Sequence, residues 1–196
     1  MKKHLISSFI LCFILIASCK SKSSEATSGI QDAELLSQGK EIAMKAQTSL
    51  GKNLMAAIKS GGADYAISFC SERAIELTDS VGLESNAGIR RVSDRNRNPM
   101  NIASDSELQY IINAKKALAA GDVIKPRLET KEGTKYGYYP ILTNELCIQC
   151  HGNPEIDITE STLAELNRLY PQDDATGYGV NELRGIWVIE LDNILK

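Results

Sequence analysis

Apolar residues recur at helical spacing through the first half of the chain. Over 34–60 they fall three or four positions apart, and Gly61-Gly62 then interrupt the pattern. A second amphipathic segment covers 64–82 and opens with an aspartate suited to cap a helix. A serine and a glutamate three residues apart form a capping box for a third helix over 104–118, which Gly121 ends. The spacing therefore predicts three helices, the first of them long.

The second half of the chain has a different pattern. Short runs rich in β-branched and aromatic residues, separated by turn residues, occupy 123–128, 136–142 and 185–191. We expect these runs to form antiparallel strands. A further short helix is expected over 160–169, where Pro171 ends it. Because helices come first and strands later, the sequence predicts an α+β fold with a long N-terminal helix.

The N-terminus has the pattern of a secretory signal. Two lysines precede an apolar run over 5–17, and small residues lead directly to Cys19. The run is shorter than the ~20 residues that span a bilayer, so we expect a signal peptide over 1–18. Its Ile-Ala-Ser-Cys end resembles the lipobox of bacterial lipoproteins, which implies lipid on Cys19 and a protein anchored on the periplasmic side of a membrane. An ordinary signal peptide with an incidental cysteine is the alternative.

The remaining chain divides into a tether and one domain. Residues 19–33 begin with a polar, Ser- and Lys-rich stretch that cannot pack, so we expect a flexible tether there. Residues 34–196 have the length of a single domain. The formal net charge of the chain is −3, and no dense Lys/Arg face is evident in the sequence, so nothing indicates nucleic-acid binding.

One motif carries a specific chemistry. Cys147, Cys150 and His151 form a C-x-x-C-H sequence. At this spacing two thiols reach the two vinyl groups of a haem, and the histidine that follows reaches the iron. The motif predicts one covalently attached haem c, with His151 as an axial ligand of the iron.

Two other uses of these cysteines compete with haem. A thioredoxin-like redox pair starts a helix after a strand, and Gly152-Asn153-Pro154 argues against a helix here. A structural zinc site would combine Cys70 with Cys147, Cys150 and His151 in a Cys3His tetrahedron. Secretion favours haem over both, because c-type haem is attached outside the cytoplasm.

The second axial ligand has few candidates. His4 leaves with the signal peptide, so His151 is the one histidine of the mature chain. What remains is an open position or one of four side chains, namely Met44, Met55, Met100 and Cys70. An unpaired thiol is a liability in an oxidising compartment, and binding to iron would remove it. This argument favours Cys70, while the methionines and an open position stay as alternatives.

An arginine-rich stretch lies between the second and third predicted helices. It contains Arg90, Arg91, Arg95 and Arg97 among several amide side chains. Because a guanidinium is a planar fork suited to carboxylates, these arginines could hold the haem propionates or a small anion. A solvent-exposed loop whose arginines pair with Asp94 would have the same composition, so both interpretations stay open.

From about residue 34 to residue 191 the chain resembles a bacterial c-type haem family that was long catalogued as a domain of unknown function. The resemblance rests on five segments: 68–70, 89–99, 146–152, 177–178 and 183–185. It implies a PAS-like antiparallel sheet flanked by helices. It also implies that His151 and Cys70 are the two axial ligands of the iron.

Three functions follow as hypotheses. The first is an electron carrier or redox sensor, with one haem and a redox partner that the sequence does not identify. The second is a sensor of a small gaseous ligand that displaces Cys70 and signals through a partner. An enzyme such as a small peroxidase ranks last, because no spare histidine is available for acid–base chemistry. We therefore expect a haem protein that is not an enzyme.

Overall fold

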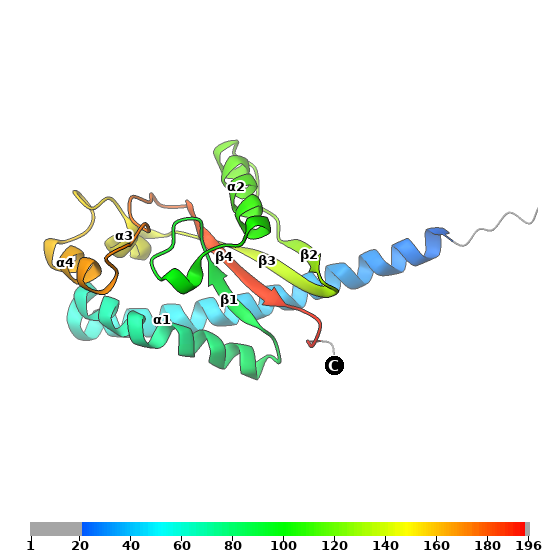
Figure 1. The fold of residues 1–196 in the computed structure, drawn as a ribbon, viewed down its shortest axis with the longest axis horizontal. Helices are drawn as coiled ribbons and strands as arrows, with labels where there is room; N and C mark the ends of the chain where they lie inside the picture. The colour runs from blue at the N-terminus through cyan, green and yellow to red at the C-terminus, as the bar shows by residue number, and fades with distance from the viewer. Residues whose placement is uncertain (1–20, 195–196) are drawn as a thin grey trace, which may run out of the picture.

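A four-stranded antiparallel sheet separates two helical layers in the computed structural model, which describes residues 21–194 (Figure 1). The strands lie in the order β1 (Ile89–Val92), β4 (Leu183–Glu190), β3 (Thr134–Leu142) and β2 (Arg127–Lys131). Helix α1 (Ser21–Glu84) covers one face of the sheet, and α2 (Asp105–Ala119) lies on the other (Figure 1). The predicted α+β fold, with an antiparallel sheet flanked by helices and a long N-terminal helix, is confirmed.

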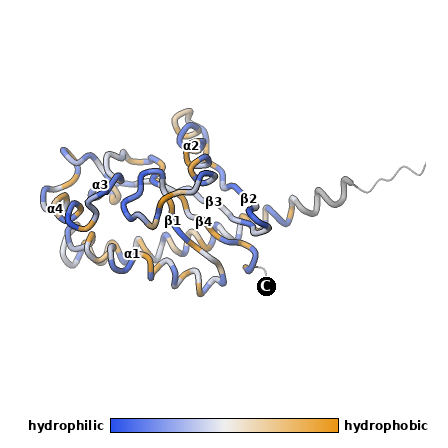
Figure 2. Tube along the Cα trace, in the orientation of Figure 1, coloured by the Kyte–Doolittle hydropathy of each residue, from blue (hydrophilic) through white to orange (hydrophobic). Residues whose placement is uncertain are grey.

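Helix α1 is a hairpin of two arms. Gly61 and Gly62 depart from helical geometry, and Gly62 has a φ of 77°, which glycine adopts without a steric penalty. The arms before and after this turn run side by side in opposite directions (Figure 1). Hydrophobic residues recur along both arms between hydrophilic ones (Figure 2). The two helices predicted over 34–60 and 64–82 are therefore present, and they meet at the predicted break.

The tether expected over 19–33 is helical from Ser21 onward, which corrects that prediction. Asp32 pairs with Lys135 at 2.6 Å, and Leu35 is buried against the sheet. Once that part of α1 is packed, each residue added to the end of the helix costs little, because the helix is already nucleated. The signal peptide predicted over 1–18 and the lipidation site Cys19 lie outside the described residues. Within the described part of the chain, no helix has the length and apolar character needed to span a bilayer.

The core lies on both faces of the sheet because strand residues alternate between them. On the α1 face, the helical residues Leu35, Ile42, Ala43 and Ala46 pack with Tyr139, Trp187 and Ile189 of the strands. On the α2 face, the helical residues Tyr110, Ile111 and Ala114 pack with Tyr138, Ile186 and Val188. Both faces are therefore sealed by apolar contacts near the centre of the sheet.

Several predicted elements are found with small changes in their bounds. Ser104 and Glu107 form the expected capping box of α2, and α4 spans Glu160–Leu169 as predicted. Strand β2 begins later than the predicted run 123–128, because Pro126 has no N–H for the ladder. Glu132 and Gly133 form the β2–β3 turn with positive φ values and place Lys131 opposite Thr134.

Three elements were missed. Strand β1 is short and carries two arginines, so it lacks an apolar run. The 3₁₀ helix η1 (Pro99–Asn101) is a single turn. The helix α3 (Glu145–His151) contains the C-x-x-C-H motif, which we had expected not to be helical. Asn144 caps α3 by accepting a hydrogen bond from the Cys147 amide, and Gly152 ends it, so the glycine terminates the helix rather than preventing it.

Candidate functional site

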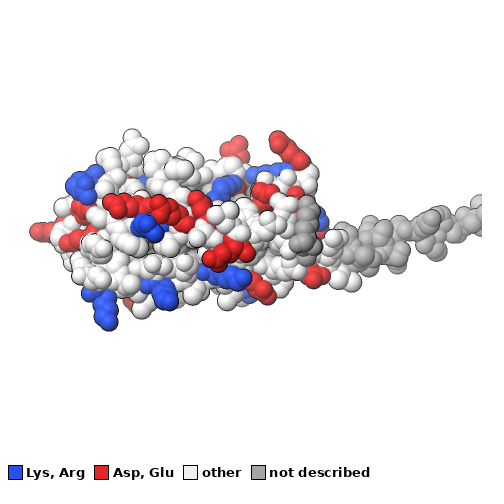
Figure 3. All heavy atoms as spheres, turned by 90° about the horizontal axis from the view of Figure 1, so that it is seen from below, with Lys and Arg blue, Asp and Glu red and all other residues white. Residues whose placement is uncertain are grey.

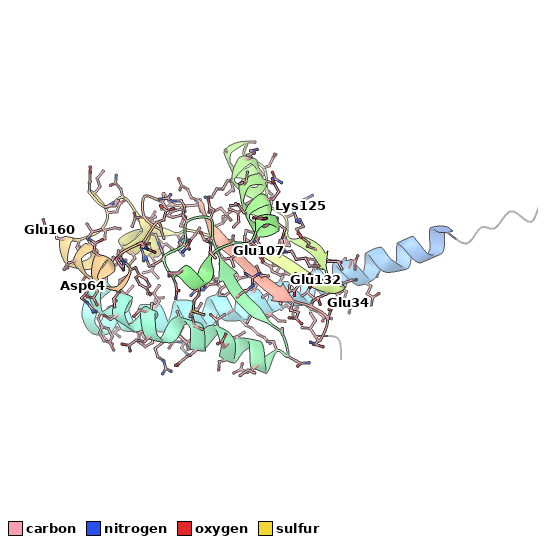
Figure 4. All side chains as sticks on the ribbon, viewed as in Figure 1. Glu34, Asp64, Glu107, Lys125, Glu132 and Glu160 are labelled. Atoms are coloured by element: carbon pink, nitrogen blue, oxygen red, sulfur yellow. The ribbon has the colours of Figure 1, made fainter. Side chains whose placement is uncertain are left out.

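A cavity of about 250 Å³ lies between the two arms of α1, the sheet and α3. It is near the end of the molecule where the α1 turn meets α4, which Figure 4 marks by the labels of Asp64 and Glu160. Most of its wall is apolar and comes from both arms of α1, from β3 and from α3: Leu50, Leu54, Ile58, Ile67, Ile75, Ile141 and Leu146. The cavity is thus a predominantly hydrophobic slot that opens beside the C-x-x-C-H helix.

The sequence-predicted chemistry converges on this cavity. Cys70, from the second arm of α1, lines it together with Cys147, Cys150 and His151 of α3. The three methionines considered as alternatives do not line it, and their residues are 59 % (Met44), 61 % (Met55) and 75 % (Met100) exposed. Of the four side chains weighed as second axial ligand, Cys70 is the one that lines the same cavity as His151.

Helix α3 places the three motif side chains on one face. Residues three and four apart on a helix are neighbours, so Cys150 and His151 both lie one turn beyond Cys147. Gly152 ends the helix where a Cβ would come within 2.6 Å of the Ile148 carbonyl oxygen. A larger residue there would push the end of α3 away from the segment that follows. The glycine therefore helps to fix the position of His151.

His151 is held in one orientation by the loop that precedes β4. Its Nδ1 lies 2.6 Å from the carbonyl oxygen of Ala175. A carbonyl oxygen only accepts, so Nδ1 carries the proton and Nε2 keeps a free lone pair. Burial, and after it the charges of Arg97 and Arg184, hold the pKa of His151 well below its ordinary value. The side chain is a neutral imidazole with one nitrogen available as a metal ligand.

Two of the cavity thiols, Cys70 and Cys150, are protonated in the protein alone. Burial raises the pKa of Cys70, although the charges of Arg91 and Arg97 act in the opposite direction. Burial also raises the pKa of Cys150, to about 11. Neither thiol has the environment of a reactive thiolate, which a low pKa would indicate. A cofactor that binds these sulfurs covalently or as ligands would have to displace their protons.

Two of the four candidate arginines line the cavity. Arg97 donates to Asp173 at 3.0 Å and to the carbonyl oxygen of Cys150 at 2.6 Å, so it holds the end of α3. Arg91 lies over the ring of Trp187 at 5.6 Å, and none of the ion pairs among the described residues includes it. Arg91 therefore presents a cation to the cavity without a carboxylate to balance it.

The other two arginines are placed elsewhere. Arg90 donates to Glu107 on the opposite face of the sheet, because neighbouring strand residues point to opposite faces. We therefore no longer assign Arg90 to a propionate. Arg95 donates to the carbonyl oxygen of Asp174 at 2.9 Å and stacks on Tyr178 at 4.7 Å, outside the cavity lining. Its contacts secure the loop that holds His151.

Sequence reasoning missed Arg184 as a site residue. It lies on β4 beside His151 and stacks on Tyr178 at 5.4 Å. The β3–β4 register shifts at this point, since Ile141 faces Gly185 whereas Leu142 faces Leu183. Arg184 is therefore the extra residue of a bulge, which re-aims its side chain. Gly185, a glycine inside a strand run, is the sequence signal of a bulge that was available, and the Leu-Arg-Gly segment was among those that carry the family resemblance.

Among residues 29–194, whose side chains are described, no group of three or more His, Cys, Asp or Glu side chains is arranged to hold a metal ion. Cys70 and the three motif residues share a cavity but do not form the tetrahedron of a zinc site. The geometry therefore favours a larger ligand that occupies the cavity beside Cys70 and α3 over a metal ion coordinated by all four side chains.

The fold and the cavity define a mixed α+β domain that can enclose an apolar ligand between a helical hairpin and a sheet. The family model described as Tll0287-like matches residues 21–191, so the chain belongs to the Tll0287-like family. The crystal structure of the cyanobacterial haem protein Tll0287 is similar, with a TM-score of 0.56 and 14 % sequence identity, and the match covers 82 % of this chain and 93 % of that chain. At this identity the likeness shows the fold. No curated protein matches the chain.

Proposed function

We propose that this chain is a mono-haem c-type protein that transfers electrons or senses redox state outside the cytoplasm. The observation that carries the proposal is that Cys70 lines the same cavity as Cys147, Cys150 and His151 of the C-x-x-C-H helix. Membership of a family whose solved relative is described as a haem protein supports haem as the cofactor. We also propose that the fold is PAS-like, as the family resemblance implies.

In this proposal Cys147 and Cys150 hold the haem through thioether bonds, and His151 and Cys70 bind the iron. The neutral His151 ring offers Nε2 to the metal while the Ala175 carbonyl oxygen holds Nδ1–H. A thiolate ligand donates electron density and favours ferric iron, so we expect a low reduction potential. When bound, the haem supplies a one-electron redox centre, and the chain orients it and shields it from water.

The residues of the cavity fit a haem. The apolar wall suits the porphyrin, whose faces and vinyl edge are hydrophobic. Arg91 lacks a carboxylate partner among the described residues, and it suits an anionic propionate. Arg97 also lines the cavity, but its charge is already paired with Asp173. We therefore assign the main propionate contact to Arg91.

The proposed location and partners follow from the N-terminal pattern. A lipid on Cys19 would hold the domain at the periplasmic surface of a membrane, where a redox partner protein would meet it. The visible face in Figure 3 has acidic and basic side chains interspersed, with no broad basic patch. This distribution supports the proposal that nucleic acid is not a partner. We also propose that the protein is a carrier or sensor rather than an enzyme.

The test is expression together with the haem-maturation machinery, followed by absorption spectra of the oxidised and reduced protein. We expect haem that stays with the polypeptide after denaturation, and loss of that attachment when Cys147 and Cys150 are both changed to Ala. Cys70→Ala should keep the covalent haem but lose the thiolate-type ferric spectrum. A protein that binds stoichiometric zinc and no haem would overturn the proposal.

The sensor alternative makes a different prediction in the same samples. Cys70 is on the second arm of α1, beyond the glycine turn, so its bond to iron would join two separate elements. If nitric oxide displaces Cys70 from the iron at micromolar concentrations, the spectrum will change to that of a nitrosyl complex. A carrier would keep both ligands under the same conditions.

A further inference from the structure

Arg184 is an unbalanced cation directly behind His151. Its guanidinium donates to Ser93 Oγ at 2.9 Å and to the carbonyl oxygen of Arg95 at 3.0 Å. Both partners are neutral, and none of the ion pairs of the described side chains includes Arg184. Because a guanidinium stays protonated in proteins, Arg184 carries a full positive charge in the cavity wall.

The contact between Arg184 and His151 is one of charge. Arg184 Nε lies 3.3 Å from His151 Nδ1, but that nitrogen already carries a proton, which it donates to Ala175. Nδ1 therefore has no lone pair to accept a hydrogen bond from Arg184. The guanidinium sits beside the ring nitrogen that faces away from the proposed iron position. The Ala175 carbonyl oxygen draws on the Nδ1 proton and makes the ring a stronger electron donor through Nε2. The charge of Arg184 has the opposite effect.

The β-bulge explains why this cation is present at the site. An unbulged β4 would alternate regularly from Ile186 back to Arg184 and would direct both side chains to the α2 face. The register shift at Leu183 interrupts that alternation, and Leu183 itself packs in the α2-face cluster. Bulges of this kind recur next to functional sites, where they redirect one side chain.

We infer that Arg184 is a positioning residue that raises the reduction potential of the haem by acting through His151. The inference rests on the proposed function. A positive charge near the iron stabilises the state that holds one more electron. The same charge withdraws electron density from the imidazole and weakens its donation to ferric iron. Arg184 thus counteracts the low potential that a thiolate ligand imposes.

The experiment is a spectroscopic redox titration of the holoprotein and its Arg184→Met variant. Methionine keeps much of the side-chain length and removes the charge. We expect the variant to retain its haem and to show about a tenfold lower ratio of ferrous to ferric haem at a fixed applied potential, which is a shift of about 59 mV for one electron. The control is Arg127→Met, which removes the same formal charge beside Tyr110 and Tyr138. Arg127→Met should not change the reduction potential of the haem.

Arg184→Lys keeps the positive charge but changes the shape of the side chain. It therefore keeps the inference testable if Arg184→Met folds poorly. If the charge acts as inferred, the lysine variant should recover most of the wild-type potential. An unchanged potential in Arg184→Met would overturn the inference, and so would an equal fall in both variants, because that result would assign the effect to ring placement alone. Failure of the wild-type protein to bind haem would instead refute the proposed function and is seen before any titration begins.

Discussion

Arg90 and Arg91 are neighbours on β1, yet they occupy opposite sides of the sheet. Arg90 faces α2, where it donates to the buried carboxylate of Glu107. Arg91 faces the two arms of α1 and the cavity that contains Cys70. On one side the protein supplies its own counter-charge, and on the other it does not. The difference distinguishes an arginine that stabilises the fold from one that is ready to bind an anion.

The two environments also differ in how polar groups are satisfied. Glu107 accepts from Arg90 and from the Ser104 amide, and its place at the start of α2 is visible in Figure 4. Burial alone would raise the pKa of Glu107, but these hydrogen bonds hold it below its ordinary value. Burial lowers the pKa of Arg91, with only the Cys70 and Tyr170 side chains acting in the opposite direction. A buried charge without a paired partner is costly, so a ligand is the reasonable partner for Arg91.

The largest effect is expected from Arg91→Glu, which puts a carboxylate where the proposed propionate lies. Loss of charge-assisted hydrogen bonds costs about 1.5–3 kcal/mol, and repulsion between the new carboxylate and the propionate adds to that cost. We therefore expect at least about a 100-fold weaker affinity for haem. The affinity is best measured by haem titration in the Cys147→Ala, Cys150→Ala background, where the cofactor is not covalently held.

Arg91→Met is the matched neutral variant. It should weaken haem binding about tenfold and leave the unliganded fold as stable as before, because an unpaired cation is replaced by an apolar side chain of similar length. Circular dichroism during urea denaturation measures the stability of the unliganded fold. Unchanged haem affinity in Arg91→Met would remove Arg91 from the proposed site and end the contrast with Arg90.

Glu107→Ala should have the opposite profile. The change removes the capping box of α2 and the acceptor for Arg90, so we expect a loss of about 1–3 kcal/mol in the free energy of unfolding. The haem spectrum should be unchanged, because the site is on the other face of the sheet. Urea denaturation with parallel absorption spectra tests both statements. A changed haem spectrum in Glu107→Ala would show that the two faces are coupled.

The pH dependence of stability sharpens the role of Glu107. Its pKa is lowered in the folded state, so the stability it contributes is complete above the unfolded-state pKa and is lost as pH falls through the folded-state pKa. Arg90 on β1, Lys131 on β2 and Glu190 on β4 are the charged groups around it. We expect the stability difference between wild type and Glu107→Gln to stay constant from neutral pH down to the unfolded-state pKa of the carboxyl group and to shrink only below it, as measured by urea denaturation at several acidic pH values. A constant difference would exclude the ion pair as its source.

The sequence predicted those parts of the molecule whose causes are local. The capping box at Ser104 and the glycine turn at Gly62 each depend on a few adjacent residues, and both were found. Strand β1 could not be predicted, because its arginines are accommodated by the facing side chains Glu107 and Trp187, which are distant in sequence. Propensity is a weak guide where tertiary contacts decide.

The candidate site divides in the same way. The C-x-x-C-H motif is local and was identified from spacing alone, and Cys70 followed from elimination and from the family resemblance. The identity of the free arginine could not be read from the 90–97 stretch, because it depends on which acid meets which guanidinium in space. Arg184 depends on a change in strand register, and Gly185 suggests a bulge in the sequence without telling where the neighbouring side chain points.

The smallest effect is expected from Arg90→Met. The Arg90 side chain is 50 % exposed, whereas that of Glu107 is 1 % exposed, so the arginine loses little solvation when it pairs and gains little from the pair. Because Glu107 keeps its hydrogen bond from the Ser104 amide after the change, it is not left as an isolated buried charge. We therefore expect a cost of about 1 kcal/mol, with the acid-induced loss of stability moving to higher pH as Glu107 loses its cation. A double-mutant cycle with Glu107→Gln measures the coupling directly. A coupling several times larger would mean that Arg90 is as dependent on its carboxylate as we propose Arg91 to be on its ligand.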